Sequence, residues 1–63
     1  MDIGKNIARL RHELGYTQEA LAARLHVSSA AVSKWEHGSS FPDISTLPIL
    51  ARIFDVSIDE LLN

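Results

Sequence analysis

Apolar residues recur three and four positions apart along most of the chain, which is the spacing of amphipathic α-helices. This pattern predicts five helices, over residues 3–14, 18–25, 29–37, 45–54 and 58–62. No alternation of apolar and polar residues typical of a β-strand competes with them. The sequence therefore predicts an all-α fold, with residues 1–63 forming a single domain.

Local signals mark where these helices begin and end. Short polar side chains suited to N-capping precede four of the helical stretches, at Asp2, Thr17, Ser28 and Ser57. Ser57 and Glu60 also have the spacing of a capping box. Gly15 and Gly38 stand where the first and third helices are expected to stop.

The segment between the third and fourth helices is a loop by composition. Phe41 is expected to anchor it in the core. Pro48 is tolerated only in a first turn, so the regular fourth helix should begin no earlier than about Ser45. Asp43 is the competing N-cap. The last helix is too short to stand alone and is expected to dock through Ile58 and Leu61.

The stretch Thr17–Gly38 contains two short helices joined by a turn of about three residues, the layout of a helix-turn-helix. At about 100° per residue, the second helix divides into two arcs. One arc is apolar and suited to a core; it holds Ala31, Val32 and Trp35. The opposite arc is small, polar and positively charged; it holds Ser29, Ala30, Ser33, Lys34 and His37.

Such a polar arc can enter the major groove of DNA, which is about 12 Å wide and exposes base edges to side chains. The helix start at Ser28 would also point unpaired N–H groups and a positive dipole end at phosphates. The alternative is a solvated helix face with no partner. Periodicity by itself does not decide between the two interpretations.

Composition limits the choice of function. The net charge of -2 counts against a nucleic acid partner, because phosphate binding normally leaves a basic footprint. The charge is polarised, however: Asp55, Asp59 and Glu60 come late, whereas most Lys and Arg residues lie in the first three helical segments. With no apolar run of about 18 residues and no signal-peptide pattern, we expect a cytoplasmic protein without a membrane partner.

Catalytic and metal-binding patterns are missing. His12, His26 and His37 have no metal-ligand spacing, and the chain has no cysteine. No nucleophile motif or glycine-rich phosphate loop occurs. The sequence therefore predicts neither an enzyme nor a bound metal or cofactor.

The string LGYTQEALAARLHVSSAAVSKWEHG, followed by P-D-I-x-T-L-x-x-L-A and D-V-S-I-D-E-L-L, resembles the helix-turn-helix family of phage repressors and Cro, the XRE family. The resemblance covers Ile7 to Leu62. It implies a compact five-helix bundle of the lambda repressor-like DNA-binding kind, whose third helix reads the major groove. The expected function is transcriptional regulation, with repression as its effect, by a homodimer on a palindromic double-stranded operator.

The resemblance also implies roles for particular residues. Gln18 matches the glutamine that opens the second helix and contacts phosphate. Ser29, Ala30, Ser33 and Lys34 match base-facing or phosphate-facing positions. Arg11 and Glu36 match an ion pair between the first and third helices. His26 replaces the usual glycine of the turn, so a positive φ is expected there.

A protein-interaction module, such as an antitoxin or adaptor with secondary or lost DNA binding, remains the rival interpretation. A net acidic chain would suit that role. Duplex binding that falls steeply with salt would favour the DNA reader, whereas binding insensitive to salt would favour the adaptor.

Overall fold

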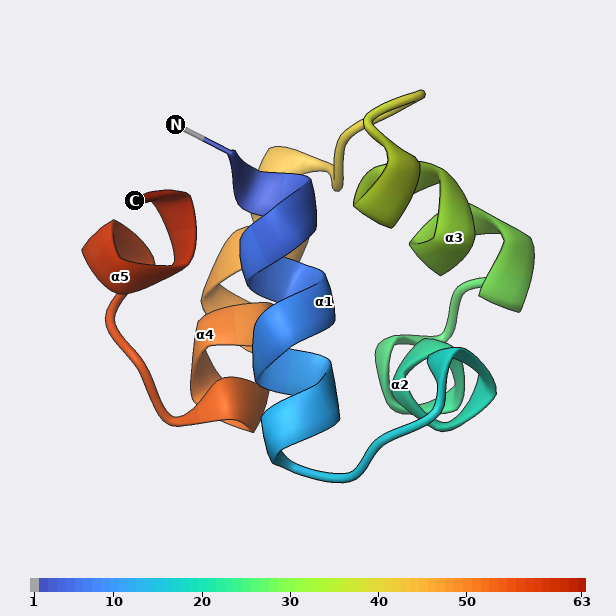
Figure 1. Ribbon diagram of the computed structural model, residues 1–63, viewed down its shortest axis with the longest axis horizontal. Coiled ribbons are helices and arrows are strands. Elements are labelled where there is room, and N and C mark those ends of the chain that lie inside the picture. Colours follow the sequence, from blue (N-terminus) through green and yellow to red (C-terminus); the bar gives the residue numbers. More distant parts are fainter. Residues whose placement is uncertain (1) are drawn as a thin grey trace.

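The computed structural model describes residues 2–63, which form an assembly of helices without strands in that range (Figure 1). The elements are α1 (Ile3–Glu13), α2 (Gln18–Leu25), α3 (Ser29–His37), the short 3-10 helix η1 (Ile44–Thr46), α4 (Leu47–Phe54) and α5 (Ile58–Leu62). The predicted all-α fold of five helices is confirmed.

Side-chain caps begin four of the helices, as the sequence indicated. Each cap side chain accepts a hydrogen bond from the backbone N–H three residues further on; the caps are Asp2, Thr17, Ser28 and Ser57. Glu60 completes the capping box by accepting from the Ser57 backbone. These bonds satisfy donors that a helix start otherwise leaves without partners.

The fourth helix begins differently. Neither Asp43 nor Ser45 caps it, because the two side chains bond to each other, with Ser45 Oγ donating to Asp43 Oδ2 over 2.6 Å. A 3-10 turn comes first, and Pro48 occupies the first turn of α4. The regular helix therefore starts at Leu47, consistent with the limit set by Pro48 and two residues later than the predicted range.

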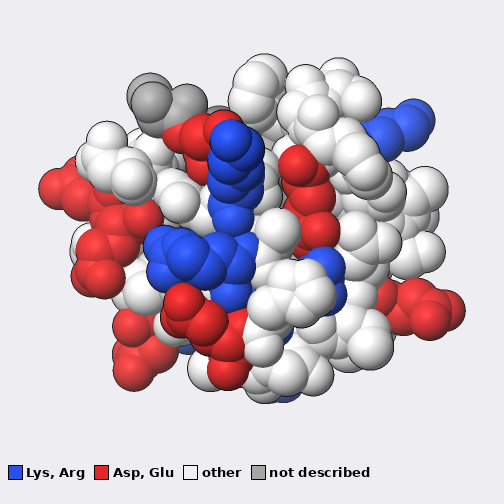
Figure 2. All heavy atoms as spheres, in the orientation of Figure 1, with Lys and Arg blue, Asp and Glu red and all other residues white. Residues whose placement is uncertain are grey.

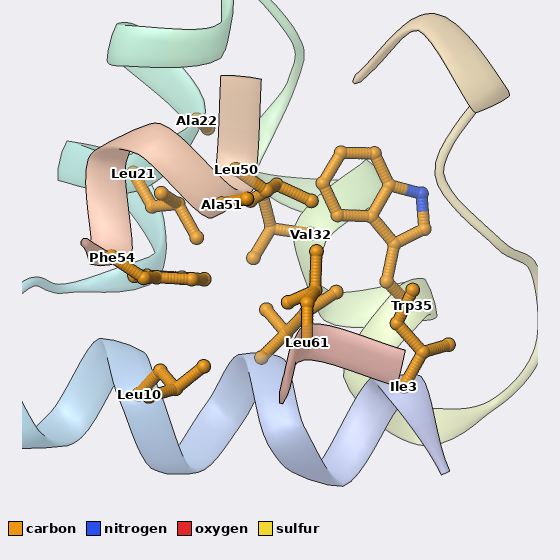
Figure 3. Packing of buried hydrophobic residues seen from close by; sticks show 11 residues of the cluster. Ile3, Leu10, Leu21, Ala22, Val32, Trp35, Leu50, Ala51, Phe54 and Leu61 are labelled. Atoms are coloured by element: carbon orange, nitrogen blue, oxygen red, sulfur yellow. The ribbon is translucent and has the colours of Figure 1, made fainter. Parts of the chain in front are cut away.

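One hydrophobic cluster joins all five α-helices (Figure 3). Its buried members are Ile3, Ile7, Leu10, Leu21, Ala22, Val32, Trp35, Leu50, Ala51, Phe54 and Leu61. α1 lies in the middle, with α2 and α3 on one side and α5 on the other (Figure 1). α3 contributes Val32 and Trp35 to this cluster, so its rotation about its own axis is fixed by burial.

Two expected contacts were wrong. Phe41 is 71% exposed, and the adjacent Pro42 is the loop residue that is buried. Ile58 is 41% exposed, so α5 docks through Leu61, which is fully buried. Both errors concern short segments, where helical periodicity extends over too few residues to decide which side chain points inward.

α1 approaches α3 very closely at Gly4. A Cβ atom placed on Gly4 would collide with the carbonyl oxygen of Trp35 and lie 3.3 Å from that of Glu36. Glycine is therefore required where the start of α1 crosses the end of α3.

Candidate nucleic-acid interface

The polar arc of α3 is open to solvent. Ser29, Ala30, Lys34 and His37 are exposed and Ser33 is half-buried, whereas Val32 and Trp35 of the opposite arc are buried. The division of α3 into an inward and an outward face is therefore confirmed. The outward side chains are short except for Lys34 and His37, which leaves the helix backbone accessible.

His37 and Ser33 interact with each other on this face. His37 Nδ1 lies 2.8 Å from the Ser33 carbonyl oxygen, to which it must donate, and 3.4 Å from Ser33 Oγ. A neutral ring held in this way offers Nε2 as an acceptor, and a protonated ring offers it as a donor. The His37 side chain is thus oriented along its own helix.

The starts of α2 and α3 both present backbone donors. The caps Thr17 and Ser28 each satisfy one N–H, at the third residue of the helix. Within residues 2–63, the first two N–H groups of each helix have no partner. Such groups form the positive ends of helix dipoles and favour anions.

The turn between α2 and α3 depends on His26. Its φ of 59° and ψ of 40° lie in the left-handed region, which confirms the expected positive φ. The N–H of Val27 reaches back to the carbonyl of Ala22 over 3.0 Å and closes the helix end. The chain then enters the Ser28 cap within two residues.

Arg11 and Glu36 form a bidentate ion pair between α1 and α3. Arg11 Nε donates to Glu36 Oε2 over 2.7 Å, and Nη2 donates to Oε1 over 3.1 Å. The two side chains are only 10% and 9% exposed. Arg11 Nη1 also donates to the Tyr16 carbonyl over 2.9 Å, which ties the pair to the α1–α2 connection. The expected proximity of the two residues is confirmed.

Gln18 joins this pair, which the sequence did not reveal. Its Nε2 donates to Glu36 Oε1 over 3.0 Å, so α1, α2 and α3 meet at one carboxylate. The resemblance had assigned Gln18 only to phosphate. An amide nitrogen carries two hydrogens, and one of them remains for another acceptor.

Burial alone would raise the pKa of the Glu36 carboxyl. Hydrogen bonds from Arg11 and Gln18, together with the Arg11 charge, outweigh that effect and hold the pKa below its ordinary value. The hydrogen bond to Glu36 in turn raises the pKa of Arg11. Both groups are charged at neutral pH. Because Glu36 is turned inward, Lys34 is the one Lys, Arg, Asp or Glu side chain on the outward face of α3.

Charge on the rest of the surface is mixed. Acidic side chains gather over α5, and basic ones run along α1 (Figure 2). Two of the α1 cations are paired with neighbours, Lys5 with Asp2 at 3.8 Å and Arg9 with Glu13 at 3.2 Å. Arg24 lies 5.3 Å from the centre of the Tyr16 ring, and its Nη1 donates to the tyrosine hydroxyl over 2.8 Å.

Residues 2–63 hold no group of three or more His, Cys, Asp or Glu side chains placed to bind a metal ion. The same residues form no pocket. None of the described helices is long and apolar enough to cross a membrane.

Comparison with known proteins places these features in a family. Residues 7–61 match the Helix-turn-helix family. The chain is 41% identical over 63 residues to the HTH-type transcriptional activator BcrR of Enterococcus faecalis, covering all of this chain and 31% of that protein. It is 36% identical over 63 residues to the HTH-type transcriptional regulator ImmR of Bacillus subtilis, covering all of this chain and 50% of that protein. The chain thus spans half or less of the length of these two relatives.

Solved structures show the same fold. The P22 c2 repressor in complex with a synthetic operator superposes with a TM-score of 0.88 at 31% identity, covering 97% of this chain and 92% of that chain. SinR, the master regulator for biofilm formation, in complex with DNA superposes with a TM-score of 0.85 at 32% identity, covering 97% and 98%. The family match, the two-helix turn at His26 and these structures show that the chain belongs to the XRE and Cro type of helix-turn-helix DNA-binding domains, a non-enzymatic family.

Proposed function

We propose that this chain binds double-stranded DNA in a sequence-specific way, with α3 in the major groove, and acts as a transcriptional regulator. The outward face of α3 is the observation that carries the proposal. The side chains of this face are mostly short, and its Lys34 is free of ion pairs among residues 2–63. The one acidic residue of α3, Glu36, lies off this face in a buried ion pair. This face can approach base edges without presenting a carboxylate to them.

Base recognition falls to the outward residues of α3. Lys34 is the best candidate for a base contact, because an ammonium group donates readily to guanine O6 and N7. Ala30 can pack on a thymine methyl group, and the hydroxyls of Ser29 and Ser33 can bond to several base edges.

Phosphate binding falls to the two helix starts. Gln18 would donate to a phosphate from its side chain at the first position of α2. Ser28 marks the start of α3, where free backbone N–H groups can serve a second phosphate. His37, at the other end of α3, would donate to a phosphate when its ring is protonated. These contacts position the protein and carry no sequence information.

We further propose that the chain acts as a homodimer on a palindromic operator. The readers of one α3 are few and short, so one copy would bind weakly. Two copies on one face of the duplex would bind half-sites about 34 Å apart, one turn of DNA. The P22 c2 repressor, solved in complex with a synthetic operator, supports operator binding and repression as the effect. Cytoplasmic localisation is part of the same proposal.

The proposal is tested by titrating wild type, Lys34→Ala and Gln18→Ala against preferred and scrambled duplexes at several salt concentrations. Lys34→Ala should cost about 1 to 3 kcal/mol on the preferred site and relax selectivity at one base pair per half-site. Gln18→Ala should weaken both duplexes alike, because phosphate contacts are independent of sequence. Lys5→Ala is the matched control: it removes an exposed lysine of α1 and should leave selectivity unchanged.

Two results would contradict the assignments. Equal losses on both duplexes for Lys34→Ala would make it a phosphate contact rather than a base reader. No duplex binding by the wild type at low salt would favour the rival role, a protein-interaction module. The exposed Phe41 and Ile44, at 71% and 81%, are the observation that favours this rival, because apolar side chains gather at protein interfaces.

A further inference from the structure

We propose that Glu36 is a positioning residue for DNA binding: its carboxylate, oriented by Arg11, holds the Gln18 side-chain amide so that the second Nε2 hydrogen serves a phosphate. This inference rests on the proposed phosphate contact of Gln18. It assigns to Glu36 a task beyond linking α1 to α3.

Three hydrogen bonds from Arg11 and Gln18 hold the carboxylate of Glu36. Its Oε2 accepts from Arg11 Nε at 2.7 Å, and its Oε1 accepts from Arg11 Nη2 at 3.1 Å and from Gln18 Nε2 at 3.0 Å. Arg11 is itself fixed by its bond to the Tyr16 carbonyl. Two parallel bonds to one guanidinium favour one orientation of the carboxylate plane, so Oε1 is an acceptor at a defined place.

That fixed acceptor selects one orientation of the Gln18 amide. A carboxylate only accepts hydrogen bonds, so the amide nitrogen of Gln18, and not its oxygen, must face Glu36. One hydrogen of Nε2 is then used and the other is left for an outside acceptor. Without Glu36, the amide can rotate and turn its oxygen toward a phosphate, where two acceptors repel each other.

The orientation of the Gln18 amide matters because Gln18 lies at a helix start that can bind a phosphate. Gln18 is the first residue of α2, and its backbone N–H is one of the donors without a partner among residues 2–63. Side-chain and backbone donors of one residue therefore lie at the same helix start. A side chain already fixed in the free protein loses less conformational entropy when it binds.

The amide resonances of the free protein test the orientation without DNA. Gln18 is the only glutamine of the chain, and Asn6 and Asn63 supply the only other side-chain amides. In ¹⁵N-labelled protein, one Gln18 amide proton should be displaced downfield and should return toward the position of an exposed amide in Glu36→Ala. In wild type, the same displacement should shrink as Glu36 is protonated in acid, measured at pH values where circular dichroism shows that the domain is still folded. A Gln18 amide resonance that shifts neither in Glu36→Ala nor in acid would overturn the proposal.

Affinity for DNA tests the use of that orientation through a four-protein cycle of wild type, Glu36→Ala, Gln18→Met and the double variant. Glu36→Ala should weaken duplex binding about 10-fold when Gln18 is present, the scale of a hydrogen bond to a charged group. It should have little effect in the Gln18→Met background. Any general effect of freeing Arg11 near DNA appears in both backgrounds and cancels. Equal effects in the two backgrounds would show that Glu36 acts only through the fold and would overturn the proposal.

Asn6→Ala is the matched control for lost stability. It removes a partly buried hydrogen bond between α1 and α5, from Asn6 Nδ2 to the Leu61 carbonyl at 2.8 Å. α5 lies on the opposite side of α1 from α2, which begins with Gln18 (Figure 1). It should change neither the Gln18 resonance nor the cycle. If the proposed function is wrong, the results differ from those that overturn this inference. Wild type would then not bind duplex at low salt, while the displacement of the Gln18 amide proton in the free protein would persist.

Discussion

Replacing Gly4 by Ala sets two effects of known sign against each other. In an exposed helix interior, Ala is favoured over Gly by about 1 kcal/mol, so helix propensity alone predicts a more stable domain. In this structure, the added methyl group would lie closer than 3.0 Å to the Trp35 carbonyl oxygen, a separation that Cβ atoms essentially never show. The obstacle is helix backbone, which cannot move aside as a flexible side chain would.

The clash therefore has to be relieved by moving α1 away from α3. Overpacking of this kind costs about 1 to 3 kcal/mol, so we expect a net loss of about 1 kcal/mol. For a domain of this size, that corresponds to a decrease of roughly 5 °C in Tm. Urea unfolding followed by circular dichroism, with thermal unfolding as a second probe, measures the change.

Ala23→Gly provides the matched control, because Ala23 is exposed within α2 and reports helix propensity alone. It should lose about 1 kcal/mol. If Gly4→Ala stabilised the domain by a similar amount, the close approach of α1 and α3 would be refuted.

Three further outcomes are expected. Arg11→Ala and Glu36→Ala should each lower the free energy of unfolding by about 3 kcal/mol because each leaves a buried charge unpaired, and the double variant should lose clearly less than the sum. A coupling energy near zero in this double-mutant cycle would show that the ion pair does not stabilise the fold. His26→Gly and Asp55→Gly should each gain about 1 kcal/mol in urea unfolding, since both residues have a positive φ, of 59° and 57°; unchanged midpoints would mean that neither turn is strained. Because the folded-state pKa of Glu36 is lowered, its stabilising contribution is complete above the ordinary glutamate pKa of about 4.3 and is lost as pH falls through the lower folded value. An acid titration of stability should show this loss in wild type and a smaller one in the Arg11 and Glu36 double variant.

Features encoded by neighbouring residues could be predicted from the sequence. The caps at Thr17 and Ser28 act over three residues, and the structure shows both. The outward face of α3 follows from the burial of Val32 and Trp35, which helical spacing already indicated. The positive φ of His26 and the Arg11 to Glu36 pairing came from family resemblance, because spacing alone does not relate residues 25 positions apart.

Features that depend on how elements meet could not be predicted. The Gln18 bond to Glu36 requires the relative position of α2 and α3, which no local pattern contains. The same is true of Gly4, whose role appears only where two helices cross. The prediction that Phe41 anchors the loop was wrong for a related reason. A loop has no repeat that distinguishes an inward position from its neighbour, and Pro42 is buried in place of Phe41.

The bond from Asn6 to the Leu61 carbonyl has a practical consequence for protein engineering. It brings the first turns of α1 beside the end of α5, and α5 lies on the side of α1 opposite α2 and α3 (Figure 1). A short linker could therefore join the two ends, and a circular permutant could be opened in the exposed loop around Ser39, where no helix is interrupted. A fluorescent reporter fused after α5 would lie on the opposite side of α1 from α3 and its outward face (Figure 1).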